Sequence, residues 1–232
     1  MRSIWRTLDS TLIRDIITLA GGAAVIGVSF GAIAVAAGLP WWLPCVMSVL
    51  VFAGGSQFLA VGVIAAGGGP VAAVIGGLVL NARHLPFGLA VGDVFGRHWA
   101  SWLVGSHLLI DETTAFAMAQ RDPQRARAVY WASGIAMFGG WNLGTVLGVS
   151  AGQVIGDPGA FGLDAAFPAA LLALVLPSLR DRLTLRAALM GAVIAVGCTP
   201  FLPGGVPVLL ALAGLIVAVR AEEPRVCAGE GR

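Results

Sequence analysis

The stretch IITLAGGAAVIGVSFGAIAVAAG, residues 16–38, decides the class of fold because it contains no charged side chain. A helix rises 1.5 Å per residue, so a helix of this length spans the roughly 30 Å hydrocarbon core of a bilayer. The apolar core of a cleavable signal peptide is shorter, about 7–15 residues. We therefore expect these residues to remain in the protein as a membrane-spanning helix.

The rest of the chain has the same apolar character. Of its 232 residues, 58% are hydrophobic and 11% are charged, whereas soluble domains average about 25% charged residues. Such a chain cannot cover a water-facing surface with polar groups, so a lipid bilayer must surround much of it. Its arginines are scattered and form no patch for nucleic acid. No nucleotide-binding Walker sequence is present, which argues against ATP hydrolysis.

Further apolar segments follow, and they predict an all-α, polytopic transmembrane bundle of seven or eight membrane segments. The last third differs because its segments are short and interrupted by proline and glycine. We expect broken or re-entrant helices there, as beside transporter binding sites, or else plain short helices in a thin bilayer region. The first five segments are expected at 16–38, 43–66, 71–92, 99–120 and 128–155, and the short ones at 165–179, 187–202 and 206–219.

The domain organisation and orientation follow from the charges. Residues 1–15 alternate apolar and charged side chains at helical spacing, which predicts an interfacial amphipathic helix. Residues 16–220 then form a single transport domain, and 221–232 a short tail. Arginines gather before the first span, at 121–127 and at 180–186. Since cytoplasmic loops are rich in arginine, the N-terminus is predicted to be cytoplasmic. The acidic turn at 157–164 is predicted outside.

Charged side chains inside apolar spans are the main functional signal, because each costs roughly 2.5–3.5 kcal/mol at mid-depth. One cluster is Asn81-x-Arg83-His84 in the third span. A guanidinium in a dry cavity suits a carboxylate, which it can grip with two parallel hydrogen bonds. Alternatively, Arg83 pairs with Asp111 or Glu112 and holds two helices together.

The second cluster is Ser106-His107-x-x-x-Asp111-Glu112-Thr113-Thr114 in the fourth span. In a regular helix His107 and Asp111 lie at i and i+4, so they face the same way and could form a proton-carrying pair. Alternatively, this segment lies near a helix end or a water-filled vestibule and is simply solvated.

A third feature carries no charge. Gly54-Gly55-Ser56-Gln57 interrupts the second span with small and polar residues. Small residues let helices approach closely, and Gln57 can bond a ligand or another helix. The three cysteines show no metal-ligand spacing, so we expect neither a metal site nor a cofactor.

Together these segments resemble the AzlC family of bacterial branched-chain amino-acid exporters. The resemblance covers roughly residues 20–155 and includes Phe30-Gly31, Gly38-Leu39-Pro40-Trp41-Trp42, the stretch 51–58 and both charged clusters. Gly55 departs from the alanine that the family often has there. The resemblance implies a secondary transporter in the bacterial inner membrane that exports valine, leucine, isoleucine and often methionine. It also implies a small AzlD-like membrane partner.

These residues suggest one mechanism. The substrate carboxylate meets Arg83 and backbone N–H groups at a broken helix near 54–56, and its ammonium meets Asp111 or Glu112. The substrate-binding set is Gly54, Gly55, Ser56, Gln57, Asn81, Arg83, Asp111 and Glu112, and the proton-coupling set is His84, His107, Asp111 and Glu112.

Two other classes of function compete with a transporter. An intramembrane enzyme could use the second cluster as metal ligands or as acid and base, but no HExxH or GxSxG motif is present. We therefore expect no enzymatic activity. A passive scaffold would not need charged side chains at depth, and a channel would show flux without saturation.

Overall fold

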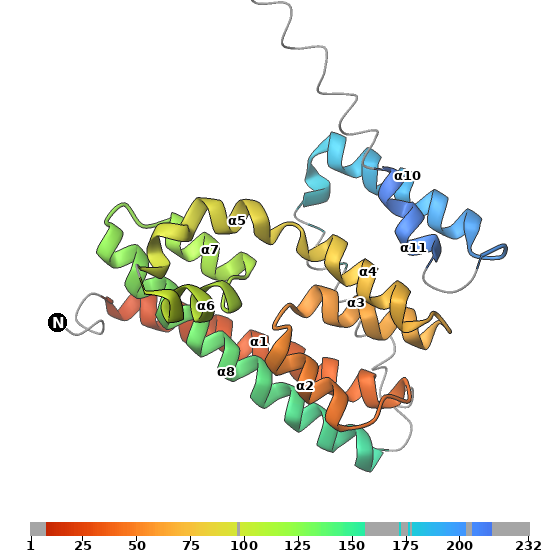
Figure 1. Ribbon diagram of the computed structural model, residues 1–232, viewed down its shortest axis with the longest axis horizontal. Coiled ribbons are helices and arrows are strands. Elements are labelled where there is room, and N and C mark those ends of the chain that lie inside the picture. Colours follow the sequence, from red (N-terminus) through yellow and green to blue (C-terminus); the bar gives the residue numbers. More distant parts are fainter. Residues whose placement is uncertain are drawn as a thin grey trace, which may run out of the picture. The chain divides into compact units, whose positions relative to one another are not determined.

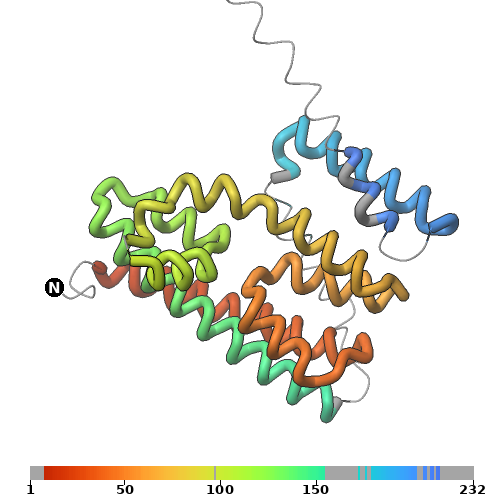
Figure 2. The backbone as a smooth tube through the Cα atoms, in the orientation of Figure 1, coloured from red at the N-terminus to blue at the C-terminus, as the bar shows by residue number. Residues whose placement is uncertain are grey.

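The computed structural model describes residues 8–96, 98–155, 172, 176, 178–202 and 206–214. Within these residues the regular elements are helices and no strand occurs, which confirms the all-α class (Figures 1 and 2). Two stretches, Ser10–Ala36 and Pro70–Phe95, are long and apolar enough to cross a membrane. A bundle of seven or eight crossings stays a prediction. The expected turns at 157–164 and 203–205, the tail at 221–232 and most of 165–179 lie outside the described residues.

The chain divides into two compact units, and each is described by itself. The first contains residues 1–58 and 78–167, and the second contains 59–77 and 168–232. A single transport domain over 16–220 stays a prediction. The candidate site lies within the first unit.

The first unit is built on two long helices, α1 (Ser10–Ala36) and α8 (Pro123–Ile155). Asp9 caps α1 by accepting a hydrogen bond from the Leu12 N–H at 2.8 Å, and this bond, together with the Arg125 guanidinium, holds the pKa of Asp9 below its usual value. Residues 10–15 are therefore the first turns of α1, continuous with the span, and form no separate helix. The Asp9–Arg125 ion pair joins the N-terminal ends of α1 and α8.

The two long helices run parallel and touch through glycines (Figure 1). Four glycines of α8, from Gly140 to Gly152, recur at every fourth residue, so they lie along one face of the helix. A Cβ added at Gly144 or Gly148 would overlap the backbone carbonyl oxygen of Ala24 or Val28 on α1. On α1, a Cβ at Gly27 would lie 2.6 Å from the carbonyl oxygen of Trp141. The contact set is Gly27 and Gly31 on α1 and Gly140, Gly144, Gly148 and Gly152 on α8.

Three of the expected spans are each two short helices separated by a break, which corrects the prediction of continuous spans there. The segment expected at 43–66 forms α2 (Trp42–Leu50) and α3 (Gly54–Ala65), and that at 71–92 forms α4 (Pro70–Asn81) and α5 (His84–Val91), followed by the 3₁₀ turn η2 (Gly92–Phe95). The segment expected at 99–120 forms α6 (Trp99–His107) and α7 (Asp111–Met118). Broken helices were expected near 54–56, where α3 begins after the first break, and in the last third, where α10 (Arg182–Cys198) is regular.

The first break has an unusual backbone at Phe52, whose φ of 41° lies in the left-handed region. Non-glycine residues adopt this region at a cost, and they keep it only where their surroundings hold them. The Phe52 ring packs edge-on against Phe138 of α8, with centroids 5.0 Å apart. Packing against α8 therefore stabilises the interruption between α2 and α3.

The other two breaks have local causes. Pro86 stands in the first turn of α5, where its missing N–H costs nothing, and its ring would clash with a helix continuing from α4. The break between α6 and α7 is closed by Thr113, whose hydroxyl accepts a hydrogen bond from the Ile110 N–H at 3.0 Å. Asp111 and Glu112 occupy the first turn of α7, where acidic side chains favour a helix N-terminus.

In the second unit, α10 begins at Asp181, which accepts a hydrogen bond from the Thr184 N–H at 2.7 Å. The short helix α11 (Val206–Leu210) and the 3₁₀ turn η5 (Ala211–Gly214) pack on α10. Another 3₁₀ turn, η4 (Ser178–Arg180), precedes α10. A Cβ at Gly191 would lie 2.7 Å from the Ala211 carbonyl oxygen, so α10 also packs through a glycine.

Candidate functional site

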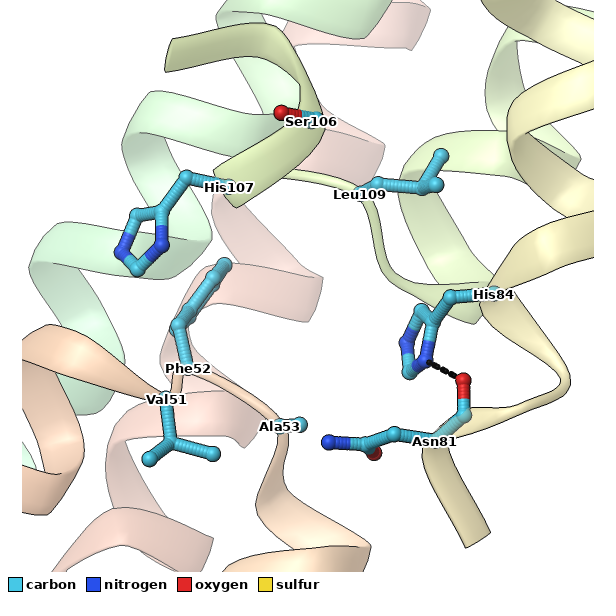
Figure 3. A pocket seen from close by; sticks show the side chains of 8 residues that line it. All are labelled: Val51, Phe52, Ala53, Asn81, His84, Ser106, His107 and Leu109. Atoms are coloured by element: carbon cyan, nitrogen blue, oxygen red, sulfur yellow. Dashed lines mark hydrogen bonds between the residues drawn. The ribbon is translucent and has the colours of Figure 1, made fainter. Parts of the chain in front are cut away.

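The three breaks meet at one cavity of about 220 Å³ in the first unit. Each pair of half-helices contributes wall residues (Figure 3). Pockets for drug-sized ligands measure roughly 300–1,000 Å³, so this cavity suits a smaller metabolite. Interrupted helices supply the free backbone groups that transporters use at their binding sites. The lining residues are Val51, Phe52 and Ala53 from the first break, Asn81 and His84 from the second, and Ser106, His107 and Leu109 from the third.

The second break leaves a backbone carbonyl free for His84. In a continuous helix the Asn81 carbonyl would accept from the Leu85 N–H, but that N–H donates to Ala82 instead, at 3.1 Å. Nδ1 of His84 lies 2.9 Å from the freed Asn81 oxygen. A carbonyl only accepts, so His84 carries its proton on Nδ1 and donates it there. The ring of His84 then points across the cavity toward Ala53 (Figure 3).

His107 is held in the same way by the first break. Its Nε2–H donates to the carbonyl oxygen of Val49 at 2.8 Å, and its ring packs against both Phe52 and Phe138, with centroids 6.2 and 5.7 Å away. The expected pairing of His107 with Asp111 is wrong. It assumed a regular helix through 108–110, whereas the break turns the two side chains to different partners.

Asp111 instead pairs with Arg83, with Nη1 and Oδ2 2.7 Å apart. Of the two roles weighed for Arg83, the structure therefore contains the ion pair between helices. Both side chains remain about a third exposed, at 34% and 35%. A Cβ at Gly55 would lie 3.7 Å from Nη2 of Arg83, so the guanidinium lies beside the first turn of α3. The positive end of a helix dipole and a guanidinium together favour an anion here.

Several polar atoms around this region are buried without a partner. Gln57 is fully buried, and neither atom of its amide has a hydrogen-bond partner within the described part of the chain. Nε of Arg83 and Oδ1 of Asn81 are also buried without a hydrogen-bond partner. Buried polar groups are normally satisfied, so such atoms call for a ligand, a water or a second conformation.

The structure brings only part of the predicted site to the cavity. Asn81, His84 and His107 line it, whereas Gly54, Gly55, Ser56, Gln57, Arg83, Asp111 and Glu112 do not. Sequence reasoning missed Val51, Phe52, Ala53 and Leu109 as cavity residues, and no local pattern singles out these apolar side chains. Over the described residues, no group of three or more His, Cys, Asp or Glu side chains could hold a metal ion.

Thr113 is expected to control the stability of the third break. Its fully buried hydroxyl bonds the Ile110 N–H and lies 3.0 Å from the Leu108 carbonyl oxygen. Thr113→Val keeps the shape and leaves the Ile110 N–H unpartnered, at a cost of about 1–3 kcal/mol. Thermal unfolding of the detergent-solubilised protein measures this loss. Thr18→Val, whose exposed hydroxyl bonds only Arg14 of its own helix, is the control. An equal loss in both variants would contradict the assignment.

The chain is similar to uncharacterized membrane proteins of two bacteria. The chain is 25% identical over 144 residues to an uncharacterized membrane protein of Haemophilus influenzae, covering 56% of this chain and 58% of that protein. The chain thus spans little more than half of that relative. It is 24% identical over 205 residues to an uncharacterized membrane protein of Helicobacter pylori, covering 85% of this chain and 87% of that protein. No solved structure gives a significant match.

The family comparison is more specific. The AzlC protein family model matches residues 18–155, which include most of α1, the three broken helix pairs and α8. The match therefore contains the whole cavity and the Arg83–Asp111 ion pair. Because it covers more than half of the chain, this membrane protein belongs to the AzlC family.

Proposed function

We propose that the chain is a secondary-active exporter of branched-chain amino acids in the bacterial inner membrane, coupled to protons and working with a small AzlD-like partner. Membership of a membrane transport family supports transport. The observation that carries the proposal furthest is the cavity at three helix breaks, with an ion pair of opposite charges beside it.

The chemistry of the site suits a small zwitterion. An α-amino acid carries a carboxylate and an ammonium, and the Arg83–Asp111 pair offers the complement of each. On binding, the substrate carboxylate replaces Asp111 on the guanidinium, helped by the N–H groups that begin α3. The released Asp111, with Glu112 beside it, then faces the ammonium. The exchange keeps every charge paired, which matters because an unpaired buried charge is costly.

The apolar part of the cavity accounts for the side-chain class. Val51, Phe52 and Leu109 supply a wall without polar side-chain atoms. Such a wall favours valine, leucine, isoleucine and methionine over polar amino acids. It separates these four from each other by only about 1–3 kcal/mol, because they differ by few methylenes.

Efflux of preloaded, labelled isoleucine from bacterial cells tests the proposal. Cells that make this chain and its small partner are expected to export isoleucine with saturating kinetics. A protonophore that collapses the proton gradient is expected to stop export. Cells with the partner alone are the control. If no aliphatic amino acid leaves faster than in the control, the exporter assignment is wrong, whereas flux that never saturates indicates a channel.

A further inference from the structure

The two histidines of the cavity differ in which ring nitrogen stays unprotonated. Each donates one ring proton to a carbonyl at a helix break, so each neutral ring keeps one unprotonated nitrogen that can accept. That atom is Nε2 in His84 and Nδ1 in His107. Two of the breaks therefore supply histidines with a basic ring nitrogen to the lining of the cavity.

His84 and His107 also differ in their surroundings. The ring of His107 packs against Phe52 and Phe138, and its hydrogen bond to Val49 ties the end of α6 to the end of α2. His84 instead faces open cavity, and none of the described residues is hydrogen-bonded to its Nε2. Figure 3 shows the Asn81 carboxamide beside it, also directed at Ala53. Oδ1 of Asn81 is buried without a partner, and rotation of the carboxamide would bring this acceptor to the cavity.

We propose that the coupling proton binds Nε2 of His84 and competes there directly with the ammonium group of the substrate. This proposal rests on the amino-acid exporter function above. An ammonium has three N–H donors. Once Arg83 binds the substrate carboxylate, Asp111, His84 and Asn81 can accept these three hydrogen bonds. Protonation of His84 removes one acceptor and adds a positive charge, so the substrate leaves.

The other titratable and charged groups around His84 are accounted for. Arg83 and Asp111 neutralise each other in the empty site. His107 is packed against two aromatic rings, and Glu112 does not line the cavity. Asp93 lies in the 3₁₀ turn after α5, His98 precedes α6, and Cys45 and Tyr130 stand on α2 and α8 away from the lining. The first break contributes no titratable side chain to the wall.

The variant His84→Gln separates proton binding from substrate binding. Glutamine can donate to the Asn81 carbonyl and offer an oxygen to the ammonium, but it does not titrate. In the wild-type protein, the apparent affinity for isoleucine is expected to fall as the pH is lowered, by up to about tenfold per pH unit for one competing proton. In His84→Gln it is expected to change less than about twofold between roughly pH 5.5 and 7.5. His98→Gln, at a histidine that does not line the cavity, is the control and should keep the wild-type pH dependence.

A second measurement uses the wild-type protein and does not depend on how well a variant folds. Isoleucine added to the purified, weakly buffered protein near pH 6 is expected to release protons. The 2-oxo acid with the same side chain keeps the carboxylate, lacks the ammonium and should release none. If isoleucine binds without proton release, or if His84→Gln keeps the wild-type pH dependence, the competition is refuted while the exporter function stands. If the wild-type protein neither binds nor exports isoleucine, both proposals fall.

Discussion

Replacing Gly144 by alanine is expected to force α1 and α8 apart and lower the thermal stability of the protein. The added Cβ would overlap the carbonyl oxygen of Ala24, a backbone atom that cannot rotate away. Overpacking of this kind costs about 1–3 kcal/mol. Gly148→Ala meets the Val28 carbonyl in the same way. Because both positions act on one interface, their effects should not simply add.

Gly139 provides a matched control on the same helix. A Cβ at Gly139 would have nothing within 4 Å, and alanine favours a helix over glycine by about 1 kcal/mol. Gly139→Ala should therefore leave the unfolding temperature unchanged or raise it. The chain has seven tryptophans, so tryptophan fluorescence of the solubilised protein can follow unfolding. Equal unfolding temperatures in the two alanine variants would show that close contact between α1 and α8 is unimportant.

The sequence was sufficient for the long helices but not for the path of the chain between them. Residues 16–38 predicted the span that α1 contains, and the segment at 128–155 predicted most of α8. The fourfold glycine repeat of α8, which sets the closest helix contact, is visible in the sequence but was not recognised. It becomes meaningful once a parallel partner is placed against it.

The breaks show which signals were overlooked and which were absent. Pro86 marks the break before α5, and Asp111-Glu112 is a typical first turn of a helix. Both signals were present, but the unbroken apolar runs outweighed them. The small and polar residues 54–57 indicated an interruption next to the first break, but nothing local marks Phe52, whose left-handed conformation is held by packing against Phe138. Such a conformation depends on tertiary structure and cannot be derived from the local sequence.

The candidate site depended on those breaks. Asn81, His84 and His107 were selected because polar residues are costly inside apolar spans, and all three line the cavity. Their partners could not be predicted, because these are backbone carbonyls that become free only where a helix is interrupted. The assumption of a regular helix led directly to the wrong pairing of His107 with Asp111.

Asp111→Asn is expected to abolish coupled export while the protein still inserts into the membrane. Asparagine keeps the size of the side chain but leaves Arg83 without an opposite charge. The pair is about a third exposed, so solvent screens it and its loss should change stability little. The proposed charge-assisted bond to the substrate ammonium is worth about 1.5–3 kcal/mol, roughly tenfold to 150-fold in a rate or affinity. Labelled isoleucine efflux, normalised to the amount of protein in the membrane, measures the loss.

A charge swap distinguishes a binding role for Arg83 from a purely structural one. The double variant Arg83→Asp with Asp111→Arg restores opposite charges across the same two helices, so its thermal stability should exceed that of either single variant. Export should not recover, because the carboxylate of the substrate would then meet another carboxylate in place of a guanidinium at the first turn of α3. Arg83→Lys, which keeps the charge but loses the two parallel hydrogen bonds, should export weakly. If the swapped protein exports isoleucine at the wild-type rate, the ion pair only joins the helices, and the substrate carboxylate binds elsewhere.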